Sequence, residues 1–258
     1  MVLRKNRKWL LVLGLVLMVA LLSGCGQQIN NTTSTADLQH GNFWEKNVVY
    51  YFSLTLDTFA DWFHGSYGLA ILLITVIVRT AILPLTLKQY RSSKAMQAIQ
   101  PQMAEIKKKH KDNPQKQQEE TMKLFQANKV NPMAGCLPLI VQMPVFMALY
   151  NSIYRNPEVR THEFLGLQLG EPGPWYFLPL IAAATTFVQS KMMQKQQTQA
   201  MPGMGAMLMI FPVLIFVMAL NFPSALPLYW IFSNIYTIVQ NYFLYVRSSN
   251  KGKEALAK

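Results

Sequence analysis

Apolar residues along this chain gather into long blocks, and the charged residues lie almost wholly between those blocks. Five blocks have lengths close to those of membrane-spanning helices, which need about 20 apolar residues to cross the hydrocarbon core. The five are residues 67–87, 132–154, 175–190, 204–220 and 226–246. The third and fourth reach only about 25 Å at about 1.5 Å per residue, a length that a locally thinned bilayer accommodates. The pattern therefore predicts an all-α membrane protein with five transmembrane helices.

Residues 88–131, between the first two spans, carry apolar side chains at helical spacing on both sides of a turn sequence. These positions are Met96, Ile99, Met103 and Ile106 before the sequence KDNP, and Met122 and Phe125 after it. Two weakly apolar helices joined by such a turn form a basic helical hairpin. The alternative interpretation is a solvated charged loop.

The spacing of apolar residues over residues 45–65 predicts an amphipathic helix before the first span. Val48, Phe52, Leu56, Phe59 and Phe63 share one helical face, while the charged residues of this segment lie elsewhere. This pattern is typical of a helix that lies in the membrane interface.

The first block, residues 1–24, differs from the other five. It begins with a region that contains four basic residues, continues with a short apolar core and ends in small residues, as secretory signal peptides do. It is followed by Cys25 in the sequence LSGC, which resembles the bacterial lipobox. The resemblance implies cleavage before Cys25 and lipidation of its thiol, whereas the alternative is an ordinary first transmembrane helix. The second cysteine, Cys136, lies in an apolar block and fits a packing role.

The basic residues set the predicted orientation in the membrane. The chain has a formal net charge of +12. Residues 88–131 carry ten Lys and Arg, and the loop 191–203 and the tail 247–258 are also basic, whereas residues 155–174 hold three Glu against two Arg. The positive-inside rule therefore predicts an outer N-terminus and a cytoplasmic C-terminus. The predicted order is a signal peptide (1–24), a lipid-anchored tether with the interfacial helix (25–66), a five-span core (67–246) and a short basic tail (247–258).

One charged residue, Arg79, lies inside a predicted span. A guanidinium stays protonated in proteins, and its placement in a bilayer costs roughly 3 to more than 10 kcal/mol. No Asp or Glu lies in any of the five predicted spans. The charge therefore requires water, a lipid phosphate or a carboxylate that another molecule supplies.

Polar side chains in the spans favour water. In the last span, Trp230, Ser233, Asn234, Thr237 and Asn241 share a helical stripe. Further polar positions in the other spans are Thr75, Thr86, Gln142, Thr185, Thr186 and Gln189. Singly, such residues more often form hydrogen bonds between helices. Together with an unpaired arginine they favour a hydrated cavity open toward the cytoplasm.

The sequence carries no motif of an enzyme. It lacks HExxH, GxSxG and a phosphate-binding glycine loop, and none of its four histidines lies in a predicted span. We predict a non-enzymatic protein without a metal or cofactor. The basic loops are explained first by topology and anionic lipid, rather than by nucleic-acid readout.

Three stretches resemble the YidC/Oxa/Alb family of membrane protein insertases in its short Gram-positive form. They are TVIVRTAILPLTLKQ around Arg79, NPMAGCLPLIVQMPVF at the end of the hairpin, and LPLYWIFSNIYTIVQ in the last span. The resemblance implies a bacterial plasma-membrane protein with a hydrophilic groove in the inner leaflet. It implies that Arg79, Gln189 and Trp230 line this groove, to which the polar stripe adds Gln142 and Asn234.

The implied function is insertion of nascent membrane proteins. Arg79 would attract acidic polar segments, and the apolar spans of the client would then pass into lipid. The ribosome, the targeting receptor and the Sec translocon are implied partners of the hairpin 88–131. The tail is short compared with relatives that use long basic tails on ribosomes. Two alternatives stay open: a transporter of a small anion or lipid that binds Arg79, and a structural scaffold that needs no particular residue there.

Overall fold

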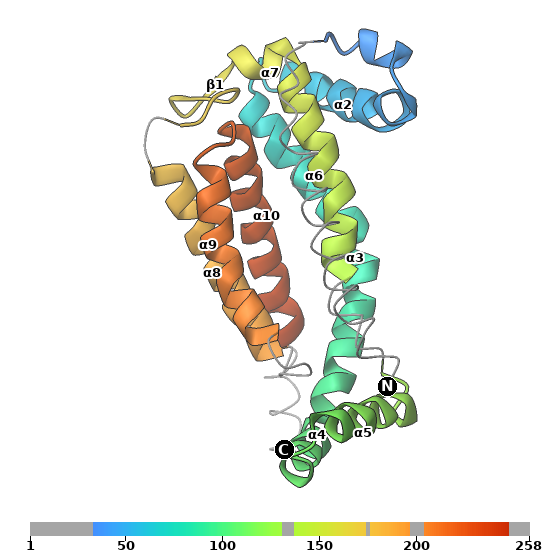
Figure 1. Cartoon of the computed structure of the whole chain (residues 1–258). Helices are drawn as coiled ribbons and strands as arrows, with labels where there is room; N and C mark the ends of the chain where they lie inside the picture. Colours follow the sequence, from blue (N-terminus) through green and yellow to red (C-terminus); the bar gives the residue numbers. More distant parts are fainter. Residues whose placement is uncertain (1–32, 131–136, 174–175, 197–203, 248–258) are drawn as a thin grey trace, which may run out of the picture. The chain divides into compact units, whose positions relative to one another are not determined.

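The computed structural model describes residues 33–130, 137–173, 176–196 and 204–247. The elements are η1 (Asp37–His40), η2 (Glu45–Val49), α2 (Tyr50–Trp62), α3 (Tyr67–Ala98), α4 (Gln100–Lys109), α5 (Pro114–Ala127), α6 (Leu137–Arg155), α7 (Pro157–Thr161), β1 (Glu163–Phe164), β2 (Leu167–Gln168), α8 (Phe177–Gln196), α9 (Met204–Ala219), α10 (Ala225–Asn241) and η4 (Tyr242–Arg247) (Figure 1). The predicted helical class is confirmed, with one addition: β1 and β2 form a short antiparallel ladder. The predicted signal peptide, Cys25, Cys136 and the tail beyond residue 247 lie outside the described residues.

Helix α3 is longer than the predicted first span. It continues to Ala98, and its 32 residues extend about 48 Å, well beyond the roughly 30 Å of a hydrocarbon core. Within the described part of the chain, α3 is the one helix long and apolar enough to cross a membrane, and α9 contains a shorter apolar stretch, Met209–Ala219. The five-span topology therefore stays a prediction. Helix α8 also continues to Gln196, beyond the predicted end of the third span at residue 190.

Part of the apolar stripe predicted for residues 45–65 faces the protein, and the interfacial position of this helix stays a prediction. Leu56 is fully buried and Phe59 nearly so, because α2 packs against α3 and α6. Tyr51 and Trp62 lie about a quarter turn around α2 from this stripe, and both are more than half exposed. Periodicity located the stripe but did not distinguish a protein neighbour from a lipid one.

Helix α10 lies between several other helices (Figure 1). It packs against α8 and α3, and α8 packs against α9. Leu178, Ala182, Ile215 and Ile231 form a buried cluster between these elements. Helix α6 differs, since it packs mainly against α2, η2 and α7 and touches α10 with fewer residues.

Helices α4 and α5 form a hairpin with a small core of its own. The buried residues of that core are Met96, Ile99, Met103, Phe125 and Val130. Most of these are the positions that gave the helical spacing in the sequence. The Asn113 side chain accepts a hydrogen bond from the Lys116 backbone and so caps the start of α5.

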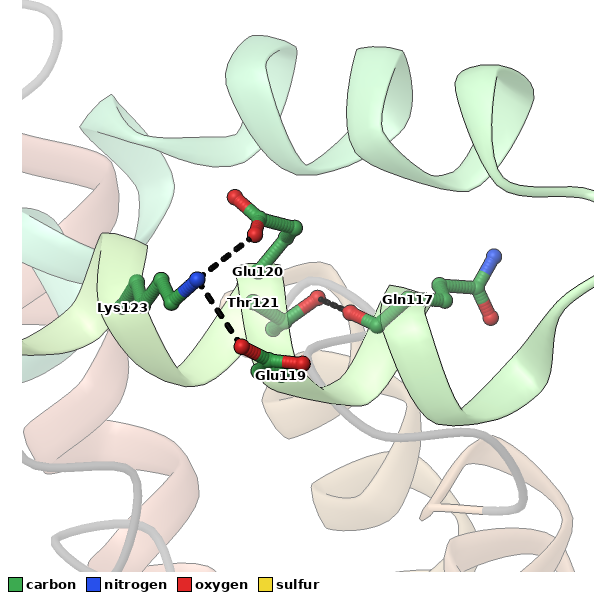
Figure 2. A network of polar contacts seen from close by, with 5 residues as sticks. All are labelled: Gln117, Glu119, Glu120, Thr121 and Lys123. Carbon is green, nitrogen blue, oxygen red and sulfur yellow. Dashed lines mark hydrogen bonds and ion pairs between the residues drawn. The ribbon is translucent and has the colours of Figure 1, made fainter.

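The surface of α5 carries a network of charged side chains. Figure 2 shows Lys123 between Glu119 and Glu120, with 2.9 Å from its Nζ to each carboxylate. Hydrogen bonds to the two carboxylates raise the pKa of Lys123, and the bond from Lys123 lowers the pKa of Glu120. Because these groups are largely exposed to solvent, the network adds little to stability.

The β1–β2 ladder packs directly on α3 at Gly68. A Cβ at Gly68 would overlap the ring of Phe164. We expect Gly68→Ala to lower the free energy of unfolding by about 1–3 kcal/mol, the usual cost of overpacking. Thermal unfolding in detergent measures the effect, and Phe164→Ala provides the control background. In that background Gly68→Ala should cost little; an equal loss in both backgrounds would contradict the packing argument.

Candidate functional site: a polar cluster around Arg79

Arg79 lies in α3 and is half-buried against α10. Its Nε donates to the Ser233 hydroxyl at 3.0 Å, and Nη2 donates to the same oxygen. Among the residues that the structure describes, no carboxylate lies within 4 Å of the guanidinium.

Two further polar contacts surround this pair. The hydroxyls of Thr80 and Tyr236 are 3.0 Å apart and join α3 to α10 one turn from Ser233. The Gln142 amide donates to the Tyr229 hydroxyl and joins α6 to α10. We call Arg79, Thr80, Gln142, Tyr229, Ser233 and Tyr236 the Arg79 cluster.

Every partner of the cation in this cluster is neutral. A guanidinium has five N–H donors, and here two of its nitrogens share one hydroxyl oxygen. A hydroxyl solvates the charge without cancelling it, so the cluster keeps a net charge of +1 on Arg79. An arriving carboxylate can therefore accept hydrogen bonds from the remaining donors. Chemically, such an arrangement can accept an anion between the helices.

Gln142 and Arg79 are the two predicted site residues that α10 brings into one cluster. Asn234 is buried and faces α8 instead, where its amide donates to Thr185 at 3.0 Å and to Thr186 at 2.8 Å. Gln189 is half-buried one turn beyond these threonines, and no hydrogen bond joins it to another described residue. Asn234 thus holds α8 to α10 and has no free N–H donor for a client.

Trp230 takes part in an aromatic contact between α6 and α10. Its ring stacks on Phe146 with 5.5 Å between centroids and 7° between planes. Phe222, in the turn before α10, lies 6.0 Å from the same ring. The predicted site residue Trp230 therefore packs in the contact between α6 and α10.

Tyr229 and Tyr236 are not among the site residues predicted from the sequence. Both lie on a stripe with Ser233 at i, i+4 and i+7, so helical spacing contained the information. The predicted stripe contained Ser233, together with Trp230, Asn234, Thr237 and Asn241, but neither tyrosine. Thr75 and Thr86, considered as cavity walls, bond to backbone carbonyls of α3 itself.

Ser233→Ala tests whether the hydroxyl stabilises the buried cation. Loss of an acceptor for a charged group costs about 1.5–3 kcal/mol. We therefore expect a lower free energy of unfolding in detergent, measured against Thr237→Ala. Thr237 is a matched control because its hydroxyl bonds only to the Ser233 carbonyl on the same helix. Equal stabilities of the two variants would show that the Arg79–Ser233 bond contributes nothing.

Comparison with known proteins decides the family. The sequence pattern of the family described as "60Kd inner membrane protein" matches residues 58–251. The chain is 43% identical over 260 residues to "Membrane protein insertase YidC 1" of Listeria monocytogenes, a match that covers 98% of this chain and 89% of that protein. This chain belongs to the YidC family of membrane protein insertases.

Two further YidC-family matches agree with this assignment. "Membrane protein insertase MisCA" of Bacillus subtilis is 44% identical over 238 residues, which cover 91% of this chain and 90% of that protein. The crystal structure titled "Active YidC insertase crystal structure with the first transmembrane domain resolved" superposes with a TM-score of 0.65 at 30% identity. That match covers 78% of this chain and 47% of the solved chain, so this chain spans about half of that protein.

Family membership confirms the resemblance drawn from the three sequence stretches. The chain is a YidC-family integral protein of a bacterial cell membrane, and the family is non-enzymatic.

Proposed function

We propose that this YidC-family chain receives nascent membrane proteins in a hydrophilic groove lined by the Arg79 cluster, attracts their acidic polar segments, and releases their apolar spans into lipid. The observation that carries the proposal is the state of Arg79. Its guanidinium is half-buried, binds a neutral hydroxyl and has no carboxylate neighbour among the described residues. A purely structural arginine at this depth would be expected to pair with an acid of its own chain.

The first step is binding of an Asp or Glu side chain of the client. Hydrogen bonds between ionised groups are shorter and stronger than neutral ones, and arginine can offer two parallel N–H donors to one carboxylate. The charge pair gains further because the effective dielectric constant between helices is lower than in water. The Ser233 hydroxyl, which holds the cation beforehand, positions it for this contact.

The groove walls come from the helices around α10. Gln142 and Gln189 supply amides on α6 and α8, and Trp230 supplies an aromatic edge. Asn234 contributes indirectly, because its hydrogen bonds to Thr185 and Thr186 hold α8, which carries Gln189, against α10. Polar walls of this kind shorten the apolar barrier that a client segment must cross.

The second step is release of the apolar span of the client. The exposed side chains of α9 include Ile210, Val213 and Val217, each more than half exposed, which offer an apolar surface continuous with lipid. Transfer of apolar area out of water yields about 25 cal/mol per Å², so a client helix supplies its own driving force. No nucleotide hydrolysis is needed in this mechanism.

The proposed topology places α3, α6, α8, α9 and α10 across the membrane, with a lipidated Cys25 outside and the C-terminus in the cytoplasm. The hairpin α4–α5 then projects into the cytoplasm, where it would meet the ribosome, the targeting receptor or the Sec translocon. Its cationic end supports this side of the membrane, because Lys107, Lys108 and Lys109 end α4.

The proposed function is tested with full-length protein in liposomes. A single-span client with an acidic translocated tail is synthesised in their presence, and protease protection of the tail is measured. Protein-containing liposomes should protect the tail, and empty liposomes or liposomes with an unrelated membrane protein should not. Equal protection in all three would reject insertion. Release of a trapped small anion without client protection would instead favour the transporter.

A further inference from the structure

A second polar junction lies at the beginning of α3, at the opposite end of that helix from α4 and α5. Its centre is Asp57 on α2, whose carboxylate is half-buried. One carboxylate oxygen accepts from the Tyr67 hydroxyl at 2.9 Å and from the Asn156 amide at 2.7 Å. The other accepts from the Thr35 hydroxyl at 2.7 Å. Asp57 therefore binds three donors from three different segments.

The donors are themselves fixed in place. Tyr67 is the first residue of α3, and Asn156 lies directly after α6; both are nearly fully buried. The side-chain Oδ1 of Asn156 accepts from the Glu158 backbone N–H at 2.9 Å and so caps α7. Through Asp57, the start of α3 is thus tied to the end of α6.

Helix α6 depends on this end of the molecule for its position. Its strongest packing is against α2, η2 and α7. Ser152 on α6 is hydrogen-bonded to Ser53 on α2 at 3.0 Å, and both are fully buried. Arg155 at its end pairs with Glu45 of η2 at 2.7 Å. Helix α2 therefore connects α6 to α3, the helix that carries Arg79.

We propose that Asp57 is a positioning residue that sets the spacing between α3 and α6, and thereby the opening over the Arg79 cluster. Gln142 lies 14 residues before Asn156 in the sequence, across α6. Along a helix this separation is about 20 Å. A tilt of α6 by about 10° around its Asn156 end therefore moves Gln142 by about 3–4 Å. A shift of this size breaks the Gln142–Tyr229 hydrogen bond. The part of the inference that concerns insertion rests on the proposed function, whereas the spacing itself does not.

The chemistry of Asp57 predicts which substitutions preserve the junction. Asparagine keeps a carbonyl oxygen for Tyr67 and Asn156, and its amide can donate to the Thr35 hydroxyl. Alanine removes all three contacts and leaves buried donors without acceptors. Asp57→Asn should therefore behave like the native protein, and Asp57→Ala should not. Asp61→Ala is the matched control, because it removes an exposed acid from the same helix.

The spacing is measured between two spin labels on the full chain by double electron–electron resonance. The labels replace Ile77 on α3 and Met143 on α6, which are 46% and 41% exposed. Cys136 is replaced by serine so that it does not react with the label, and Cys25 is kept because lipidation of its thiol would block labelling there. The same variants, without labels, are assayed for client insertion in liposomes.

We expect Asp57→Ala to shift or broaden the distance distribution by 3 Å or more and to lower insertion several-fold. Asp57→Asn and Asp61→Ala should retain both native values. Tyr67→Phe removes one bond to Asp57 and keeps the ring against His162, so it should give a smaller shift. If Asp57→Ala does not fold, Tyr67→Phe decides the question alone.

Unchanged distances in Asp57→Ala and Tyr67→Phe would overturn the proposal, as would an Asp57→Asn variant that behaves like alanine. Arg79→Ala separates the two claims, because it should lower insertion without changing the distance. If the distances shift as expected and no variant, Arg79→Ala included, alters insertion, the proposed function fails and the positioning role stands.

Discussion

Arg79→Ala is expected to lower insertion of a client with an acidic translocated tail by roughly tenfold or more. The removed interaction is a charge-assisted hydrogen bond, worth about 1.5–3 kcal/mol, and each 1.4 kcal/mol corresponds to about a factor of ten. Arg79→Lys should retain much of the activity, because a compact ammonium still attracts a carboxylate although it cannot bind it in a bidentate manner. The measurement is protease protection of the client tail in liposomes.

Two controls make this prediction specific. Arg91→Ala removes an exposed cation from the same helix and should leave insertion unchanged. A client whose tail acids are replaced by amides should depend little on Arg79. Equal insertion by all variants would mean that the arginine is structural or serves a small ligand.

Trp230→Ala is expected to have the second largest effect, on both stability and insertion. It removes the ring contacts with Phe146 and Phe222, and aromatic pairs contribute about 0.5–1.5 kcal/mol each, or about 1–3 kcal/mol together. Because α6 touches α10 with few residues, loss of this contact should also loosen the side of the groove that carries Gln142. Thermal unfolding in detergent and client insertion measure the two effects.

Trp230→Phe is the matched control for this second prediction. A phenylalanine ring can still stack on Phe146, so the variant should recover most of the lost stability. Replacement of Phe146 by leucine should reproduce part of the effect of Trp230→Ala from the other side of the contact. If Trp230→Ala has the same unfolding temperature as the native protein, the stacked rings do not stabilise the contact between α6 and α10.

Helical periodicity accounts for most of the fold. The spacing of Met96, Ile99 and Met103, with KDNP after them, located the hairpin that the structure contains. Periodicity located the apolar stripe of α2 but did not identify its neighbours, α3 and α6. The β1–β2 ladder has only two residues per strand, too few to produce an alternating pattern.

The candidate site was found in part because a cation without an acid in the spans is visible in the sequence. Its hydrogen-bonding partner was harder to identify. Ser233 and Asn234 are neighbours on α10, yet one side chain faces α3 and the other faces α8. Only the packing of α10 between these helices decides which polar residue meets Arg79. The Asp57 junction was missed for the same reason, since its donors are up to 99 residues away in the chain.

The most direct test of the account is a photo-cross-link from the groove to the acidic segment of a stalled client. A photoreactive residue replaces Gln189, which makes no hydrogen bond to a described residue, or the adjacent Val188, which is 46% exposed. We expect cross-links from position 189 to the acidic segment, loss of these cross-links in Arg79→Ala, and none from position 188 to that segment. Cross-links from position 189 that persist without Arg79, or without the acids of the client, would contradict it.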